Sequence, residues 1–109
     1  MVSEPAGQEP VREVLAEAEG LRVQLVTVDA GQRIRWHHHT DVSDTIIAVI
    51  GPVVVETAEP PERHRLAPGD RLTLPAGTVH TVSGDGGAPC RFLNIHSGGR
   101  YDFRPRTGR

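Results

Sequence analysis

Apolar and polar residues alternate along most of this sequence in short segments that glycine and proline interrupt. The alternation is clearest over residues 21–28 and 33–39, where it has the two-residue period of a half-buried strand. Other strands are predicted at residues 45–50, 53–57, 64–66, 71–74, 79–83 and 90–96. The 12 glycines and 9 prolines place turns between these segments. About eight short strands in so short a chain predict an all-β sandwich or barrel, which protects the sheet edges.

The chain has room for one small domain, because its 109 residues can enclose a single hydrophobic core. We expect residues 1–20 to form an N-terminal arm, residues 21–96 a β-barrel and residues 97–109 a C-terminal tail. Within the arm, the apolar spacing of residues 11–18 fits a short helix and also a short edge strand. Both interpretations of this segment remain open.

The predicted strand at residues 45–50 is apolar on both of its faces. One face of such a strand packs in the barrel interior, and the other face needs cover from something else. A second copy of the chain would supply that cover, so we expect a homodimer.

Charge and composition exclude several classes of function. The net charge of −2 lacks the excess of cations that binds nucleic acid or an anionic membrane. All 12 basic residues are arginines, which excludes lysine Schiff-base chemistry and favours bidentate binding of carboxylates. The single cysteine, Cys90, cannot form an intrachain disulfide. The first ten residues show no signal-peptide pattern and no apolar run is long enough to span a membrane, so we expect a cytoplasmic protein.

Histidines are the most informative residues of the sequence. Three of the six are consecutive, and His37 and His39 share one face of the predicted strand 33–39. His80 follows a turn at residues 75–77, which can bring it across from a neighbouring strand. Imidazole is the commonest protein ligand of transition metals. These histidines are therefore a candidate metal site, and the simpler interpretation of the histidine run is a solvated polar patch.

Two motifs around these histidines resemble those of the cupin family. The first runs from Gly31 through five residues to His37-His38-His39, then through four residues to Asp44 and six to Gly51. The second runs from Gly69 through five residues to Pro75-Ala76-Gly77 and through two more to His80. Seventeen residues separate the motifs, which is similar to the short spacer of small single-domain bacterial cupins. The resemblance covers residues 21 to about 96.

This resemblance implies a jelly-roll β-barrel with a metal pocket inside its wider end. It implies that His37, His39 and His80 bind one divalent transition metal, which can be iron, zinc, manganese or nickel. Asp44 stands where the family usually has glutamate, and its carboxylate reaches about 1.3–1.5 Å less far. Asp44 therefore binds the metal after a shift of its strand, binds it through water, or supports the histidines from outside. Asp41 is a weaker candidate than Asp44 for the carboxylate ligand.

Two residues outside the ligand set are expected at the pocket. Arg35 lies two residues before His37, so it should share the ligand face, where it would bind a substrate carboxylate and orient it for reaction. Tyr101 is a candidate substrate-binding residue at the pocket mouth.

The last predicted strand offers two further candidates, Asn94 and His96. If their parity points inward, Asn94 contacts the substrate and His96 acts as a general base or an extra ligand. If the opposite parity points inward, Leu93 and Ile95 fill the core instead.

The resemblance implies a small metal-dependent enzyme that acts on an anionic or oxygen-rich small molecule by isomerase, lyase or dioxygenase chemistry. The alternative is a non-catalytic cupin that binds a small ligand, or an accessory protein of a biosynthetic pathway. An enzyme keeps an open coordination position near a proton-transfer group, whereas four protein ligands close a structural site. A structure can distinguish the two hypotheses by these features.

Overall fold

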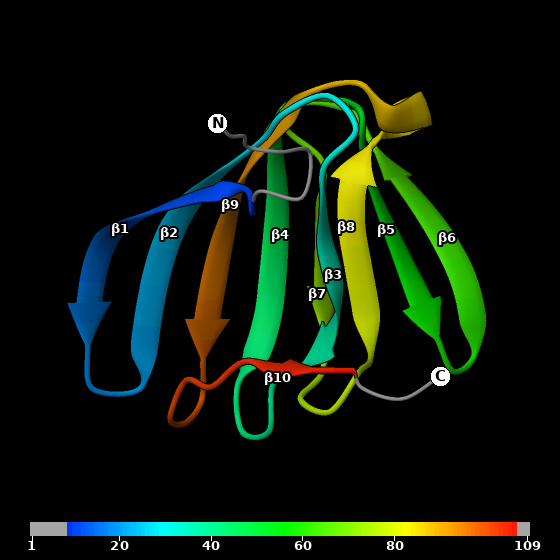
Figure 1. The fold of residues 1–109 in the computed structure, drawn as a ribbon. Helices are drawn as coiled ribbons and strands as arrows, with labels where there is room; N and C mark the ends of the chain where they lie inside the picture. The colour runs from blue at the N-terminus through cyan, green and yellow to red at the C-terminus, as the bar shows by residue number, and fades with distance from the viewer. Residues whose placement is uncertain (1–8, 107–109) are drawn as a thin grey trace, which may run out of the picture.

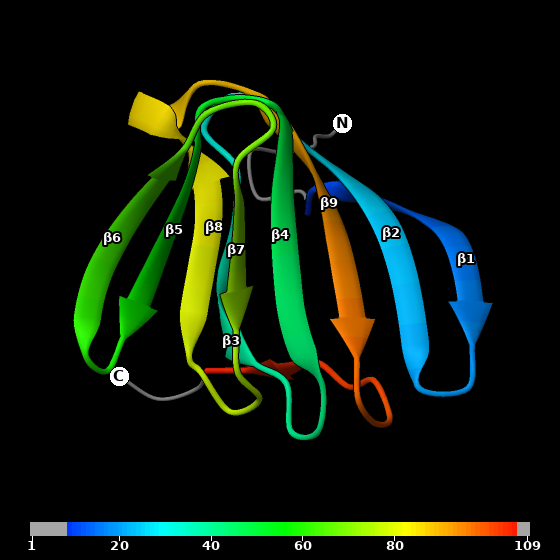
Figure 2. The same cartoon turned by 180° about the vertical axis from the view of Figure 1, so that it is seen from behind.

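The computed structural model describes residues 9–106, and in this part of the chain ten strands form two five-stranded sheets (Figures 1 and 2). The strands are β1 (Val11–Ala18), β2 (Leu21–Val28), β3 (Arg33–His38), β4 (Ser43–Ile50), β5 (Val53–Ala58), β6 (Pro61–Leu66), β7 (Arg71–Leu74), β8 (His80–Gly84), β9 (Cys90–Ser97) and β10 (Arg104–Pro105). A short 3₁₀ turn, Asp85–Gly87, lies between β8 and β9.

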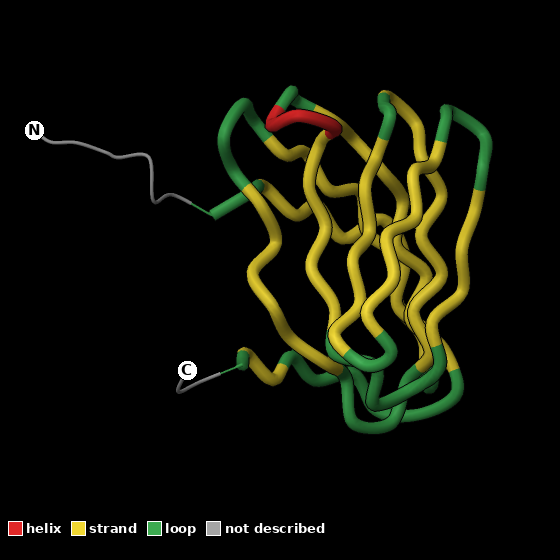
Figure 3. The backbone as a smooth tube through the Cα atoms, turned by 90° about the vertical axis from the view of Figure 1, so that its right-hand side faces the viewer, coloured by secondary structure: helices red, strands yellow, loops and turns green. Residues whose placement is uncertain are grey.

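One sheet has the strand order β1-β2-β9-β4-β7, and the other has the order β10-β3-β8-β5-β6. Every pairing within the two sheets is antiparallel. Most connections between consecutive strands cross from one sheet to the other, and the loops gather at the two ends of the molecule (Figure 3). The predicted all-β class and jelly-roll β-barrel are therefore confirmed.

The interior between the sheets changes from apolar to polar along the strands. On β9 the inward side chains are Cys90 and Phe92, then Asn94 and His96, and all four are buried. On β4 the register places Ile46 opposite Asn94 and Asp44 opposite His96. Burial of hydrocarbon in the apolar half holds the two sheets together. The polar half is not needed for this packing and can hold a functional site.

The segments that flank residues 21–96 are both attached to the sheets. β1 pairs with β2 over its whole length, with one bulge between Val14 and Ala16, so residues 11–18 form an edge strand and not a helix. β10 pairs with the end of β3, and the chain leading to it crosses one end of the barrel in Figure 1. Both segments therefore lie close to the polar end of the interior.

Within residues 9–106, no helix has the length and apolar character needed to cross a membrane. Large apolar side chains are exposed on β1 and at the end of β4, namely Val11, Val14, Leu15, Val49 and Ile50. The inward side chains of β4 are buried, and its outward side chains are half-buried or exposed. The homodimer stays a prediction.

Candidate metal centre

Three histidines from two distant stretches of the chain converge inside the barrel. His37 and His39 lie at the end of β3, and His80 begins the neighbouring strand β8, where it pairs with His37. Ring centroids are separated by 4.8 Å for His37 and His39, 4.3 Å for His37 and His80, and 5.7 Å for His39 and His80. Asp44 approaches from β4 of the other sheet, and one potential ligand atom from each of the four lies within 4.8 Å of the others. All four residues are buried.

Each of these histidines is fixed by a backbone carbonyl at its Nδ1 atom. The distances are 2.7 Å from His37 to the carbonyl of Arg35, 2.6 Å from His39 to that of Asp102, and 2.8 Å from His80 to that of Thr78. Because a carbonyl oxygen only accepts, each Nδ1 carries a proton, and in its neutral form each imidazole keeps a lone pair on Nε2. Metal-binding histidines commonly have this tautomer and this outer hydrogen bond.

Asp44 is the centre of the polar cluster. Its Oδ2 lies 3.1 Å from Nε2 of His80 and 3.4 Å from Nε2 of His39. Its Oδ1 lies 3.4 Å from Nε2 of His96 and accepts a 2.7 Å hydrogen bond from Nδ2 of Asn94. Burial acts to raise the pKa of Asp44, but its contacts with the three histidines outweigh burial and hold this pKa well below its usual value. A carboxylate anion therefore stands at the middle of the site.

The surroundings give His37 and His39 different pKa values. Burial, with the neighbouring charge of His80, lowers the pKa of His37 to about 3. Burial also acts to lower the pKa of His39, but the contact with Asp44 and the carbonyl of Asp102 outweigh it and raise this pKa. His37 is consequently neutral at ordinary pH, which is the form that can bind a metal ion.

The donor set fits a divalent transition metal. Nε2 of His39 is buried, and its 3.4 Å contact with Asp44 lacks the alignment of a hydrogen bond, so the atom has no hydrogen-bond partner among residues 9–106. Imidazole nitrogens with one carboxylate are a ligand set that zinc, iron, nickel and manganese accept. These residues border a cavity of about 10 Å³, which is room for a single species the size of a water molecule.

A chain of side-chain amides runs from the surface to Asp44. Nε of Arg22 donates to Oε1 of Gln24 at 3.4 Å, Nε2 of Gln24 donates to Oδ1 of Asn94 at 3.4 Å, and Asn94 donates to Asp44. A guanidinium only donates and a carboxylate only accepts, so the direction is consistent along the whole chain. The chain occupies Oδ1 of Asp44 and leaves Oδ2 to His80 and His39.

β9 has the parity that places Asn94 and His96 inside the barrel. Both side chains are buried, whereas Leu93 and Ile95 are half-buried on the opposite face. Nδ1 of His96 is buried and has no hydrogen-bond partner in the described part of the chain. An imidazole with a free nitrogen beside Asp44 is positioned to exchange a proton with a bound molecule. The catalytic role of His96 and the substrate contact of Asn94 stay predictions.

The expectation that Arg35 shares a face with His37 is wrong. The register between β3 and β8 shifts between Ile34 and His37, so β3 contains a bulge there. The bulge interrupts the alternation: Ile34 and His37 both point inward, and Arg35 is exposed. The guanidinium of Arg35 instead lies 6.0 Å from the centre of the Phe103 ring. Strict alternation of side chains along a strand cannot reveal a bulge. A role for Arg35 toward substrate stays a prediction.

Tyr101 lies against the histidines at the edge of the cluster. Its ring centroid is 4.8 Å from that of His96 and 5.5 Å from that of His39. The guanidinium of Arg22 lies 4.5 Å from the centre of the Tyr101 ring. Burial raises the pKa of the Tyr101 hydroxyl, which therefore stays protonated at neutral pH. Contact of Tyr101 with a substrate stays a prediction.

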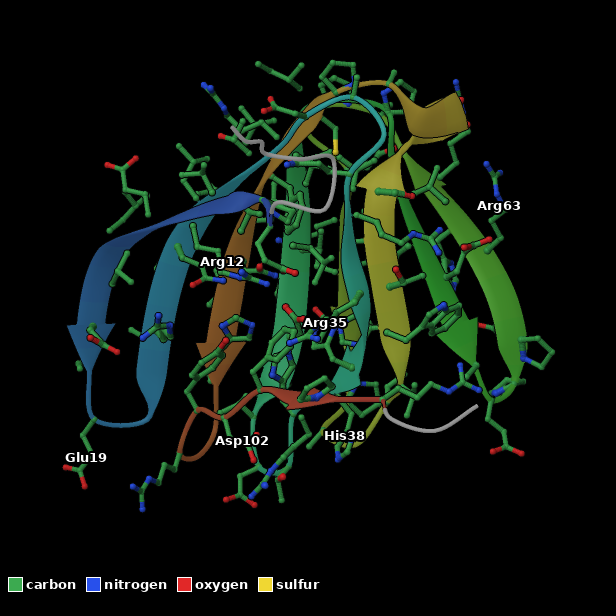
Figure 4. The ribbon with its side chains drawn as sticks, in the orientation of Figure 1. Arg12, Glu19, Arg35, His38, Arg63 and Asp102 are labelled. Carbon is green, nitrogen blue, oxygen red and sulfur yellow. The ribbon has the colours of Figure 1, made fainter. Side chains whose placement is uncertain are left out.

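Both ends of the chain bring further residues to the site that were not among those expected there. Phe103 stacks on His37, with ring centroids 4.2 Å apart and an angle of 14° between the planes. Arg12 of β1 lines the central cavity, and its guanidinium lies 5.3 Å from the centre of the Phe103 ring. In Figure 4, Arg12 and Arg35 both lie over the opening between the sheets. The pattern of neither terminal segment indicates a position at this site.

Asp102 fastens the C-terminal segment over the site. Its carboxylate accepts hydrogen bonds from the backbone N–H of Thr40 at 2.8 Å and from the Thr40 hydroxyl at 2.6 Å. Nε of Arg104 donates to the same carboxylate at 3.0 Å. These bonds hold the backbone carbonyl of Asp102 where it accepts the proton of His39 Nδ1.

Comparison with known proteins agrees with this geometry. The family model described as a cupin domain matches residues 24–96, so the chain belongs to the cupin family. No curated protein matches the chain.

Solved structures share the fold. An uncharacterized conserved protein with a double-stranded β-helix domain from Klebsiella pneumoniae is 25% identical, with a TM-score of 0.80 over 96% of this chain and 90% of that chain. The protein TT1209 from Thermus thermophilus is 26% identical, with a TM-score of 0.74 over 84% of this chain and 86% of that chain. KdgF from Halomonas sp. is 24% identical, with a TM-score of 0.74 over 89% of this chain and 87% of that chain. At 24% identity the last similarity concerns the fold alone.

Proposed function

We propose that this cupin is a small metal-dependent enzyme that acts on an anionic or oxygen-rich small molecule. One divalent transition metal would be held by His37, His39, His80 and Asp44. A single observation carries the proposal: three buried imidazoles, each with its Nδ1 fixed to a carbonyl, are gathered with one ionised carboxylate. Such a cluster without a cation would leave buried polar groups incompletely satisfied, which is unfavourable.

The bound ion would supply Lewis-acid polarisation of a substrate oxygen. The protein would supply the proton transfer through His96, whose Nε2 lies 3.4 Å from Asp44 and whose Nδ1 has no partner within residues 9–106. The amide of Asn94 would keep Asp44 in one orientation throughout. This combination serves isomerase, lyase or dioxygenase chemistry.

An anionic substrate is favoured by the arginines at the opening of the barrel. Arg12 and Arg35 lie 5.3 Å and 6.0 Å from the centre of the same Phe103 ring. Neither forms an ion pair with a residue in the described range 9–106. Guanidinium groups without an ion-pair partner bind carboxylates well, because their two parallel N–H donors match the two carboxylate oxygens.

The alternative function is a non-catalytic cupin in which the metal is structural. Two observations favour it: four protein side chains could bind the ion, and the cavity of about 10 Å³ leaves little room beside it. Under this alternative the protein would bind a small ligand without changing it.

Turnover by the metal-loaded protein distinguishes the two functions. A panel of small hydroxy- and oxo-carboxylates is incubated with protein loaded in turn with iron, zinc, manganese or nickel, and the compounds are followed by NMR. We expect one compound to be consumed by the wild type, and by the exposed control Arg71→Ala, but not by His80→Ala or His96→Ala. Consumption that survives His80→Ala would contradict the proposal. Binding without consumption would support the non-catalytic alternative.

A further inference from the structure

A cleft of about 660 Å³ lies beside the metal cavity. Its walls are the turn of the β1–β2 hairpin, residues 17–22, and the loop at residues 98–101. Its volume is in the range of small-molecule binding sites, whereas the central cavity of about 10 Å³ holds only one water-sized species. A substrate therefore cannot lie wholly inside the metal cavity, and the cleft offers the space that its remaining atoms need.

Two side chains, His96 and Tyr101, line both the cleft and the metal cavity. His96 is 2% exposed, and its Nε2 faces Asp44. The two nitrogens of an imidazole point in different directions, so Nδ1 is directed away from Asp44. This Nδ1 is buried without a hydrogen-bond partner among the described residues, and an unpaired buried polar atom is costly unless a ligand or water pairs with it.

The charged groups of the cleft leave one cation for an anionic ligand. Its basic residues are Arg22 and Arg100, and Glu17 is neutralised by a 2.7 Å ion pair with Arg22. Glu19 projects outward from the tip of the hairpin turn in Figure 4, away from the body of the protein. Arg100 forms no ion pair with any residue in the range 9–106. The same ion pair neutralises Arg22, so the guanidinium of Arg100 is the charged donor that remains for a ligand.

Two glycines of the loop at residues 98–101 line the cleft. Gly98 has a φ of 99°, a conformation that residues with a Cβ rarely adopt. A Cβ at Gly99 would lie 2.8 Å from the Cβ of Asp41, so this position also excludes a side chain. The other wall presents the apolar side chains of Ala18, Leu21 and Val42.

We propose that this cleft binds the body of the substrate, a small hydroxy- or oxo-carboxylate. The carboxylate contacts Arg100, an oxygen of the molecule pairs with His96 Nδ1, and the reacting group reaches the metal cavity past Tyr101. The reaction itself rests on the proposed function, but binding in the cleft does not.

The test is ¹H–¹⁵N NMR of the full chain, metal-free and zinc-loaded, titrated with sodium malate and, as the neutral probe, glycerol. We expect malate to shift the amides of Leu21, Gly98 and Gly99, and glycerol to leave them unchanged. Arg100→Gln should weaken malate binding about tenfold, because it removes a charged hydrogen bond. Arg100→Lys should retain part of the affinity, and Arg71→Gln on β7 should retain all of it. Spectra of the metal-free variants report directly whether each is folded.

Malate shifts that are absent, or that spread evenly over the exposed arginines, would overturn the proposal. The same samples are assayed for bound zinc by elemental analysis. Zinc binding without malate shifts at the cleft would reject the cleft and leave the metal centre standing. Malate shifts at the cleft without zinc binding would support the cleft and reject the metal centre.

Discussion

The side-chain amide of Asn94 donates a 2.7 Å hydrogen bond to Oδ1 of Asp44, and both residues are buried. Gln24 fixes the other end of the Asn94 side chain, because its own amide donates to the Asn94 carbonyl. The short aspartate side chain is thereby held in one orientation, with Oδ2 beside His80 and His39. The hydrogen-bond chain thus determines which oxygen these two histidines share.

Asn94→Leu removes this donor with little change in volume. We expect metal affinity to fall about 10-fold to 100-fold, which is the usual effect of losing a partner that orients a metal ligand. Competition with a chromophoric chelator measures the affinity. The matched control is Thr45→Val, next to Asp44 on β4, whose hydroxyl contacts Thr73 on the outer face. Equal affinities in the two variants would show that the Asn94 bond is not used to orient Asp44.

Asp44→Asn keeps the shape of the side chain and removes its charge. Because Asp44 is the ionised group at the centre of the cluster, we expect metal affinity to fall at least about tenfold. Asp41→Asn is the control, since Asp41 is exposed and lies outside the four-residue cluster. If Asp41→Asn weakened metal binding more than Asp44→Asn, the assignment of the carboxylate would be reversed.

Acid should destabilise the metal-free protein through His37. In the unfolded chain His37 takes up a proton near pH 6.5, but in the folded protein it does so only near pH 3. Between these values the unfolded state binds more protons, so the free energy of unfolding falls as pH falls, by at most about 1.4 kcal/mol per pH unit for one group. The lowered pKa of Asp44 adds a loss of stability below its usual value of 3.8.

The raised pKa of His39 acts in the opposite sense, because its contribution is present below pH 6.5 and is lost as pH rises through the folded value. Urea unfolding from pH 7 to pH 4 measures the balance. His37→Gln should reduce the slope in this range, and an unchanged slope would mean that His37 is not the neutral buried group described here.

The C-terminal segment should loosen when Asp102 loses its carboxylate. Asp102→Ala removes both acceptors of Thr40, so we expect faster hydrogen exchange at the amides of Thr40 and of Arg106, whose N–H bonds to the carbonyl of Trp36 at 2.8 Å. Asp85→Ala, which breaks ion pairs with Arg63 and Arg65 instead, is the control. Equal exchange in both variants would contradict a fastening role for Asp102.

Much of this molecule was predictable because its strands obey simple alternation. Glycine and proline mark the turns, and the predicted strands agree with β2 to β9 to within a few residues. The resemblance to cupins implied that His37, His39 and His80 converge, and the structure brings them together because β3 and β8 are neighbours in one sheet. Parity on β9 was ambiguous in sequence, because Leu93 and Ile95 are as hydrophobic as a core requires; the structure places Asn94 and His96 inside.

The rest of the site could not be predicted, because it depends on features that leave no pattern in the nearby sequence. The bulge in β3 changes the direction of Arg35 without any glycine to mark it. Arg12 and Phe103 reach the site only because β1 and β10 pair with distant strands. The hydrogen bond between Gln24 and Asn94 joins residues 70 positions apart, which no pattern along the chain can indicate.

Elemental analysis of protein purified without a chelating resin tests the metal centre most directly. We predict about one divalent transition-metal ion per chain, as expected for a single three-histidine, one-carboxylate site, and its near-complete loss in His80→Ala. His64→Ala is the matched control, because His64 lies on β6 and pairs with Glu62 away from the cluster. Metal content that is the same in wild type, His80→Ala and His64→Ala would contradict the account.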